Sequence, residues 1–102
     1  MHPAVSNGAY DVNRIRADFP ILATKVYGKP LVYLDNAASA QKPQAVLDRL
    51  QQVYTSQYAN VHRGLHYLAN EATEAYEQAR DKVAAFLNAR RKEEIIFTRN
   101  AT

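Results

Sequence analysis

The sequence has no cysteine and no tryptophan, and only three glycines and four prolines among its 102 residues. Without cysteine, these residues form no disulfide and no thiolate metal site. No apolar run approaches the roughly 20 residues that a membrane-spanning helix needs. The opening stretch, MHPAVSNGAY, lacks the apolar core of a targeting signal. We therefore expect a cytoplasmic chain that does not contact a membrane.

An excess of one charge is also missing, because thirteen lysines and arginines are scattered among ten acidic residues, for a net charge of +3. The densest positive cluster, residues 90–92, is followed at once by Glu93 and Glu94. A charged turn explains this cluster better than a nucleic-acid-binding surface, which shows a basic face with interleaved aromatic residues. With 47% apolar and 23% charged residues, the composition is that of an ordinary globular protein with a modest core.

Hydrophobic periodicity predicts three helices. The first is short and begins after Asp11, a favourable N-cap residue, and Pro20 prevents its extension. The other two carry apolar residues at helical spacing, and the last also has a charged face opposite its apolar one. The predicted ranges are 12–19, 43–58 and 68–88.

Turn residues and β-rich runs predict a hairpin between the first two helices. The runs Lys25–Tyr27 and Leu31–Leu34 flank Gly28-Lys29-Pro30, a sequence typical of a tight turn. Residues 1–10 are small, polar and aperiodic, so we expect them to be disordered.

The last apolar run, Ile95–Phe97, is continuous rather than alternating. Such runs are typical of strands that are covered on both faces, as in the parallel sheet of an α/β protein. The chain offers this strand no parallel partner, so we interpret residues 11–102 as an incomplete domain and the front portion of a larger protein.

The segment YLDNAASAQKP, from Tyr33 to Pro43, places very small side chains directly after a short apolar run. Small residues such as Ala37 and Ala38 let backbone amides approach a ligand closely. The alternative is a capped turn, in which Asp35 and Asn36 bond nearby amides ahead of the helix. Spacing alone does not separate these two interpretations.

The segment TRNAT, Thr98 to Thr102, follows the apolar run and has hydroxyl side chains at both ends. A polar turn between a buried strand and a helix binds phosphate through the free N–H groups and the dipole of that helix. The glycines and lysine of a Walker loop are missing. Alternatively, Thr102 only caps the next helix.

The segment HRGLH contains two histidines four residues apart, His62 and His66, with Gly64 between them. The glycine weakens a helix here, and no glutamate completes the zinc-protease pattern, so we do not predict a metal site. A loop beside a ligand pocket or at a subunit contact explains the histidines and Arg63 better.

Taken in order, several segments of the chain closely resemble the beginning of SUF-type cysteine desulfurases. These enzymes belong to the class V aminotransferase group of pyridoxal 5′-phosphate (PLP)-dependent enzymes of fold type I. The resemblance runs from about Val12 to Thr102. The segments are RADFPIL, YLDNAASAQKP, NVHRGLHYLANEAT, ARDKVAAFLNA and EEIIFTRNAT.

The resemblance implies a fold and a set of site residues. The fold is α/β: helices, a short hairpin and the first strand of the large-domain sheet, with the chain itself mainly α-helical. Thr102 and the backbone at Ala101 match the groups that bind the cofactor phosphate, although many relatives have Gly-Thr where this chain has Asn100-Ala101. The remaining matches are Ala37 and Ala38 on the substrate side of the pocket, and His62 and Arg63 in a loop at the dimer interface.

The implied reaction removes sulfur from L-cysteine and leaves L-alanine, with PLP as the electron sink. A protein cysteine thiolate takes the sulfur as a persulfide, which passes to an acceptor protein for iron–sulfur cluster assembly. The enzyme is expected to be a homodimer. Within the family, a selenocysteine lyase or another class V enzyme is the alternative, and outside it a stand-alone helical interaction module.

We predict that the 102-residue chain alone is inactive, since none of the family's catalytic groups falls within it and it has no cysteine to carry a persulfide. Incubation with PLP and L-cysteine is expected to release no more alanine than buffer does. Turnover above the buffer rate would contradict the prediction.

Overall fold

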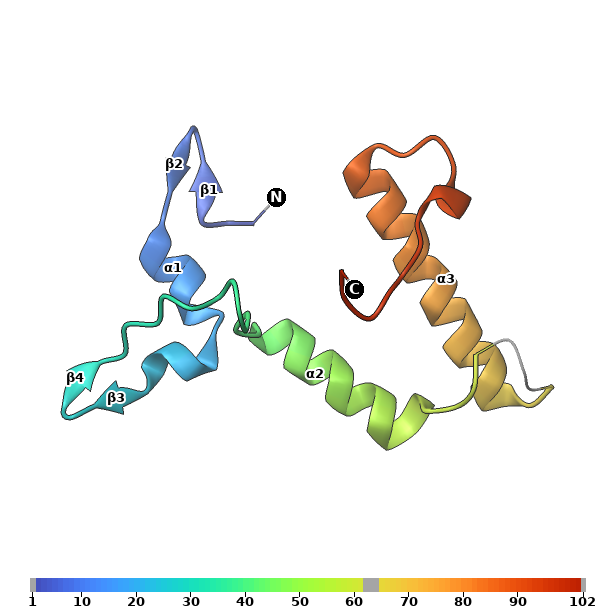
Figure 1. Cartoon of the computed structure of the whole chain (residues 1–102), viewed down its shortest axis with the longest axis horizontal. Helices are drawn as coiled ribbons and strands as arrows, with labels where there is room; N and C mark the ends of the chain where they lie inside the picture. Colours follow the sequence, from blue (N-terminus) through green and yellow to red (C-terminus); the bar gives the residue numbers. More distant parts are fainter. Residues whose placement is uncertain (1, 62–64, 102) are drawn as a thin grey trace. The chain divides into compact units, whose positions relative to one another are not determined.

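The structure, a computed structural model, describes residues 2–61 and 65–101 of the chain (Figure 1). It divides into two compact units, the first ending at Gln52 and the second beginning at Val53. Helical residues make up about half of the chain, which confirms the prediction of a mainly helical segment with a short hairpin.

The first unit opens with a hairpin in which β1 (Val5–Ser6) pairs with β2 (Ala9–Tyr10) in antiparallel fashion. The turn consists of Asn7 and Gly8, both with positive φ (48° and 78°). Asn-Gly is a favoured pair for a two-residue hairpin turn because both residues adopt this conformation at low cost. The structure therefore differs from the prediction of disorder for residues 1–10, which overlooked this turn.

Helix α1 (Val12–Ala17) begins as predicted from its N-cap. The Asp11 carboxylate accepts a hydrogen bond from the Arg14 amide at 3.1 Å, which satisfies one of the free N–H groups of the first turn. A 3₁₀ helix, η1 (Pro20–Ala23), follows directly and places Pro20 in its first turn.

The second hairpin is present, but its turn is shorter than predicted and begins one residue earlier. Strand β3 (Lys25–Val26) pairs with β4 (Lys29–Pro30), and the turn is Tyr27-Gly28, with φ values of 52° and 75°. Residues 31–34, predicted as the second strand, lie beyond the paired region. The turn that requires two positive φ angles fixes the register, and it outweighs the β-propensity of the later run.

Helix α2 (Gln44–Gln52) begins after Pro43, as predicted. The amides of Val46 and Leu47 both donate to the Pro43 carbonyl. The Gln44 amide donates to the Asp18 carbonyl at 2.8 Å, so the start of α2 is bonded to the end of α1.

The second unit begins with a π-helical turn, η2 (Val53–Gln57), over the last part of the predicted second helix. Helix α3 (Tyr67–Leu87) confirms the predicted third helix. It ends at Asn88, whose φ of 56° is the left-handed conformation that terminates many helices. Ala69 and Ala84 are its buried residues.

After α3 comes a short 3₁₀ helix, η3 (Lys92–Glu94), and then a segment without regular secondary structure. Ile95 has the extended backbone of a strand (φ −92°, ψ 117°). In the described part of the chain, however, the run Ile95–Phe97 pairs with no strand. A β-strand needs the backbone N–H and C=O groups of a neighbouring strand, and residues 2–61 and 65–101 supply no such strand here.

The buried core is small. Among the described residues, the buried apolar side chains are Ala4, Ala69, Ala84 and Ile95. Large apolar residues such as Leu34, Phe86 and Ile96 are at least 78% exposed. Within residues 2–61 and 65–101, no helix is both long enough and apolar enough to cross a membrane.

We predict that the left-handed conformation of Asn88 controls the end of α3. Asn88→Ala is expected to destabilise the last turn by about 1 kcal/mol, because alanine tolerates positive φ less well. The Ala89 amide donates to the Ala84 carbonyl at 2.9 Å. In the variant, its protection from hydrogen exchange should fall about fivefold. Asn88→Gly serves as the control and should keep this protection, since glycine adopts the conformation freely.

Candidate functional site

The small-residue loop, residues 35–41, lies in the first unit between the second hairpin and α2. The Tyr33 hydroxyl closes it by donating to the Ser39 carbonyl at 2.8 Å and to the Asp35 carbonyl at 3.3 Å. One phenol thus ties both ends of the bend together, which restricts the backbone around Ala37 and Ala38.

Hydrogen bonds within the loop make it a defined turn. The amides of Ala38 and Ser39 both donate to the Asp35 carbonyl at 3.1 Å, and the Asn36 side-chain oxygen accepts from the Gln41 amide at 3.0 Å. The capped turn that we considered from the sequence is therefore formed, with Asn36 as one of its bonding groups. Ala37 and Ala38 are exposed, so neither contributes to core packing.

A mainly apolar cavity of about 380 Å³ adjoins this loop. Its walls come from α1, η1 and both ends of the loop, and its lining residues include Ile15, Phe19, Leu22, Asn36, Ala40 and Gln41. Ala37 and Ala38, in the middle of the loop, do not line the cavity.

The second candidate segment, residues 98–101, lies in the second unit. The Thr98 hydroxyl donates to the Asn100 carbonyl at 3.1 Å, which bends the chain back on itself. Arg99 and Ala101 are exposed. The segment carries hydroxyl, guanidinium and amide groups and no acidic side chain, a composition that fits a phosphate ligand.

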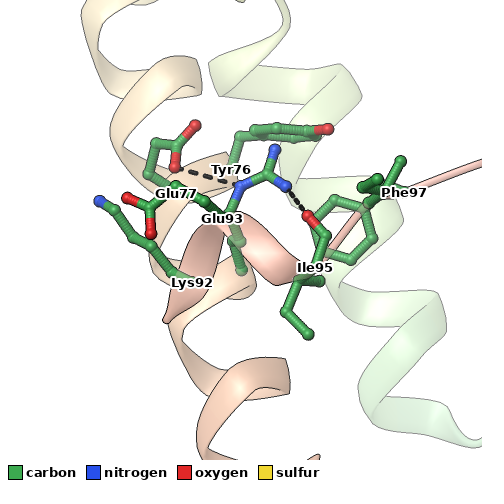
Figure 2. A pocket seen from close by; sticks show the side chains of 8 residues that line it. Tyr76, Glu77, Lys92, Glu93, Ile95 and Phe97 are labelled. Atoms are coloured by element: carbon green, nitrogen blue, oxygen red, sulfur yellow. Dashed lines mark hydrogen bonds and ion pairs between the residues drawn. The ribbon is translucent and has the colours of Figure 1, made fainter. Parts of the chain in front are cut away.

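Just before this segment, the chain packs on α3 around Arg80 (Figure 2). The surrounding hollow has a volume of about 410 Å³ and is lined by residues of α3, η3 and the run Ile95–Phe97. Figure 2 shows Tyr76 and Glu77 on one wall and Ile95 and Phe97 on the other.

Three of the predicted site residues, His62, Arg63 and Thr102, lie outside the described residues. Of the others, Ala37 and Ala38 occupy one turn of the first unit, and Ala101 lies in the second unit. His66 caps α3, where its Nδ1 accepts from the Ala69 amide at 3.3 Å. Within the described ranges, no three histidine, aspartate or glutamate side chains gather in a way that could hold a metal ion.

Sequence reasoning missed the structural roles of Tyr33, His66 and Arg80. A tyrosine two residues before a polar bend, and a histidine just before an apolar helical stripe, are local signals that could have indicated the first two. The Arg80 contact joins residues fifteen positions apart, and no local pattern marks it.

Comparison with known proteins identifies the family. The profile described as aminotransferase class-V matches residues 32–102, which is more than half of the chain. The chain belongs to this family. The matched residues include both the small-residue loop and the segment that ends at Thr102.

The class-V relatives include proteins named as cysteine desulfurases. The cysteine desulfurase of Pectobacterium atrosepticum is 55% identical over 94 residues, which cover 92% of this chain and 23% of that protein. A probable cysteine desulfurase of Synechocystis is 59% identical over 88 residues, or 86% of this chain and 21% of that protein.

A solved structure shows the same fold. The apo cysteine desulfurase of Thermococcus onnurineus matches with a TM-score of 0.72 and 37% sequence identity, over 87% of this chain and 20% of that one. The chain thus spans about a fifth to a quarter of the length of the relatives it matches. This likeness confirms the PLP-dependent fold type I architecture predicted from the resemblance.

We predict that the Tyr33 hydroxyl holds the small-residue loop in shape. Tyr33→Phe keeps the ring but removes the one hydroxyl proton that the two carbonyls share, a contact worth about 0.5–1.5 kcal/mol. The amides of Ala38 and Ser39 are expected to exchange with solvent several-fold faster, as measured by hydrogen exchange. Tyr27→Phe is the control, because Tyr27 is 99% exposed and this change should leave the loop unaffected. Equal exchange rates in the Tyr33 variant and the unaltered chain would contradict the prediction.

Proposed function

We propose that the chain is the N-terminal portion of a SUF-type cysteine desulfurase, which converts L-cysteine to L-alanine and a protein-bound persulfide. The observation that carries the proposal is 55–59% identity, over at least 86% of the chain, to one protein named cysteine desulfurase and one named probable cysteine desulfurase. The persulfide would supply sulfur to an acceptor protein for iron–sulfur cluster assembly, in the cytoplasm.

PLP is the cofactor that this proposal requires, because class V aminotransferases and cysteine desulfurases depend on it. The residues of the second candidate segment fit its phosphate in charge and size. The Ala101 backbone amide and the Thr102 hydroxyl are the proposed phosphate donors, with the positive Arg99 beside them. When bound, PLP supplies an electron sink for breaking the carbon–sulfur bond.

Ala37 and Ala38 are proposed to lie on the substrate side of the pocket. Both are exposed, and the bonds from Tyr33 and within residues 35–41 give the surrounding backbone one defined shape. A fixed backbone with methyl side chains leaves space for the side chain of the substrate L-cysteine. The hydrogen bonds prevent the loop from closing over this space. Larger side chains at these positions would fill it.

His62 and Arg63 are proposed to lie at the interface of a homodimer, near the partner's active site. The chain exposes many apolar side chains, and these support the proposal that further polypeptide packs against it. Examples are Val32, Leu34 and Ile96, each at least 76% exposed. Burial stabilises a protein by about 25 cal/mol per Å² of apolar surface, so these side chains favour coverage by the rest of the protein and by a second subunit.

The function is tested with the full-length protein that carries this chain. The purified protein is expected to contain PLP, seen by its visible absorbance, and to release alanine from L-cysteine. Alanine release from selenocysteine alone would instead indicate a selenocysteine lyase. A protein that contains no PLP and has no activity on either substrate would contradict the proposal and favour an interaction module.

Within that protein, Ala38→Leu is expected to raise the KM for L-cysteine about tenfold or more, because overpacking a fitted space costs about 1–3 kcal/mol. The PLP content should stay unchanged, since the substitution is proposed to affect the substrate side only. Ala9→Leu, at an exposed position in β2, is the matched control and should leave KM unaltered. An unchanged KM in the Ala38 variant would remove this alanine from the substrate site.

A further inference from the structure

We propose that Arg80 is a positioning residue for cofactor binding: it holds residues 95–97 on α3 and thereby sets the position of the phosphate-binding segment that follows them. This inference rests on the proposed function and assigns a role to a helix residue that lies outside the segments thought to touch the cofactor.

The Arg80 guanidinium makes several contacts at once. It donates from one terminal nitrogen to the Ile95 carbonyl, and its Nε lies 3.3 Å from the Glu77 carboxylate. Its central carbon lies 5.2 Å from the ring centroids of both Tyr76 and Phe97. Figure 2 shows the two bonds as dashed lines within the hollow. The guanidinium therefore joins α3 to the chain that returns after η3.

The two aromatic rings also contact each other. Tyr76 and Phe97 meet edge to face, with centroids 5.4 Å apart and an angle of 73° between the ring planes. An aromatic pair of this geometry contributes about 0.5–1.5 kcal/mol beyond simple burial. The cation and both rings form one cluster, so a change at Arg80 is expected to alter the position of Phe97.

Burial makes these contacts strong. The Arg80 side chain is 18% exposed and that of its partner Glu77 is 30% exposed, while Ile95 is buried. Cation–π attraction increases when water is removed from the charge, and the glutamate neutralises the buried positive charge. Lysine is a poor substitute, because only the planar guanidinium stacks on a ring while donating in its own plane.

The distance along the chain from this cluster to the phosphate donors is short. Residues 98–100 separate Phe97 from Ala101, and four residue steps span at most about 14 Å. The bond from the Thr98 hydroxyl to the Asn100 carbonyl bends this stretch and limits its freedom. A shift of Phe97 is therefore passed on to the Ala101 amide.

A positioning role differs from a general contribution to stability in one measurable respect. If Arg80 orients the phosphate donors, its loss weakens binding of PLP much more than binding of pyridoxal, the same ring without phosphate. If Arg80 only stabilises the fold, both affinities fall by the same factor. The ratio of the two dissociation constants separates these roles.

The experiment uses the full-length protein after removal of its cofactor, titrated with PLP and with pyridoxal. In Arg80→Gln the Kd for PLP is expected to rise about tenfold or more, with the Kd for pyridoxal changed less than twofold. Arg80→Lys keeps the charge and replaces the glutamine variant if that variant does not fold. Its loss of PLP affinity should be smaller than that expected for Arg80→Gln. Lys82→Gln, an exposed position on the same helix, is the control and should match the unaltered protein.

Hydrogen exchange of the same proteins checks the cause, since the residues after Ile95 should exchange faster in the Arg80 variants alone. Equal losses of PLP and pyridoxal affinity, or no loss of either, would overturn the role of Arg80 while leaving the proposed function in place. An unaltered protein that binds no PLP would overturn the proposed function, and the role of Arg80 with it.

Discussion

In the described part of the second unit, the partly buried guanidinium of Arg80 holds two segments of the chain together. In most small folds a cluster of aliphatic side chains does this. Helix α3 has two buried residues, both alanines, and Arg80 contacts the chain that returns beside it. Because this side chain binds a backbone carbonyl, a carboxylate and two rings, the path of the returning segment is set by directional contacts. Hydrophobic packing alone is non-directional and would define that path less closely.

The first unit shows the same reliance on specific polar contacts. Its small-residue loop is shaped by the Tyr33 phenol and the Asn36 amide, and its helices are linked through the Asp18 carbonyl. His2 Nε2 and an Asp18 carboxylate oxygen add a hydrogen bond at 2.6 Å. These contacts fix local shape at exposed positions, and exposed polar contacts contribute modestly to stability. A segment built in this way holds its local conformations while leaving large apolar surfaces for other parts of a protein to cover.

Features with local causes could be predicted from the sequence. Features that depend on contacts between residues far apart in the chain could not. The helices follow from apolar spacing and from caps such as Asp11, and the class V family follows from motifs in order along the chain. The hairpin turn was misplaced because two positive φ angles at Tyr27 and Gly28 override the β-propensity of residues 31–34. Ile95 has the extended backbone of the predicted strand, but the described part of the chain contains no strand that pairs with residues 95–97. Arg80 was overlooked since its contacts join positions that no local pattern relates.

The charged stretch between Asn88 and Ile95 illustrates what the Arg80 contact makes possible. It includes η3 and a bond from the Arg90 amide to the Glu94 carboxylate at 3.0 Å. One end of this stretch is held by helix α3 and the other by the Arg80 guanidinium. Its length can therefore vary without moving either end. Doubling a flexible loop costs only about 0.6 kcal/mol in closure entropy. Insertions and deletions among homologous proteins are therefore best tolerated here, where they lengthen a surface connection and leave the chain on either side in register.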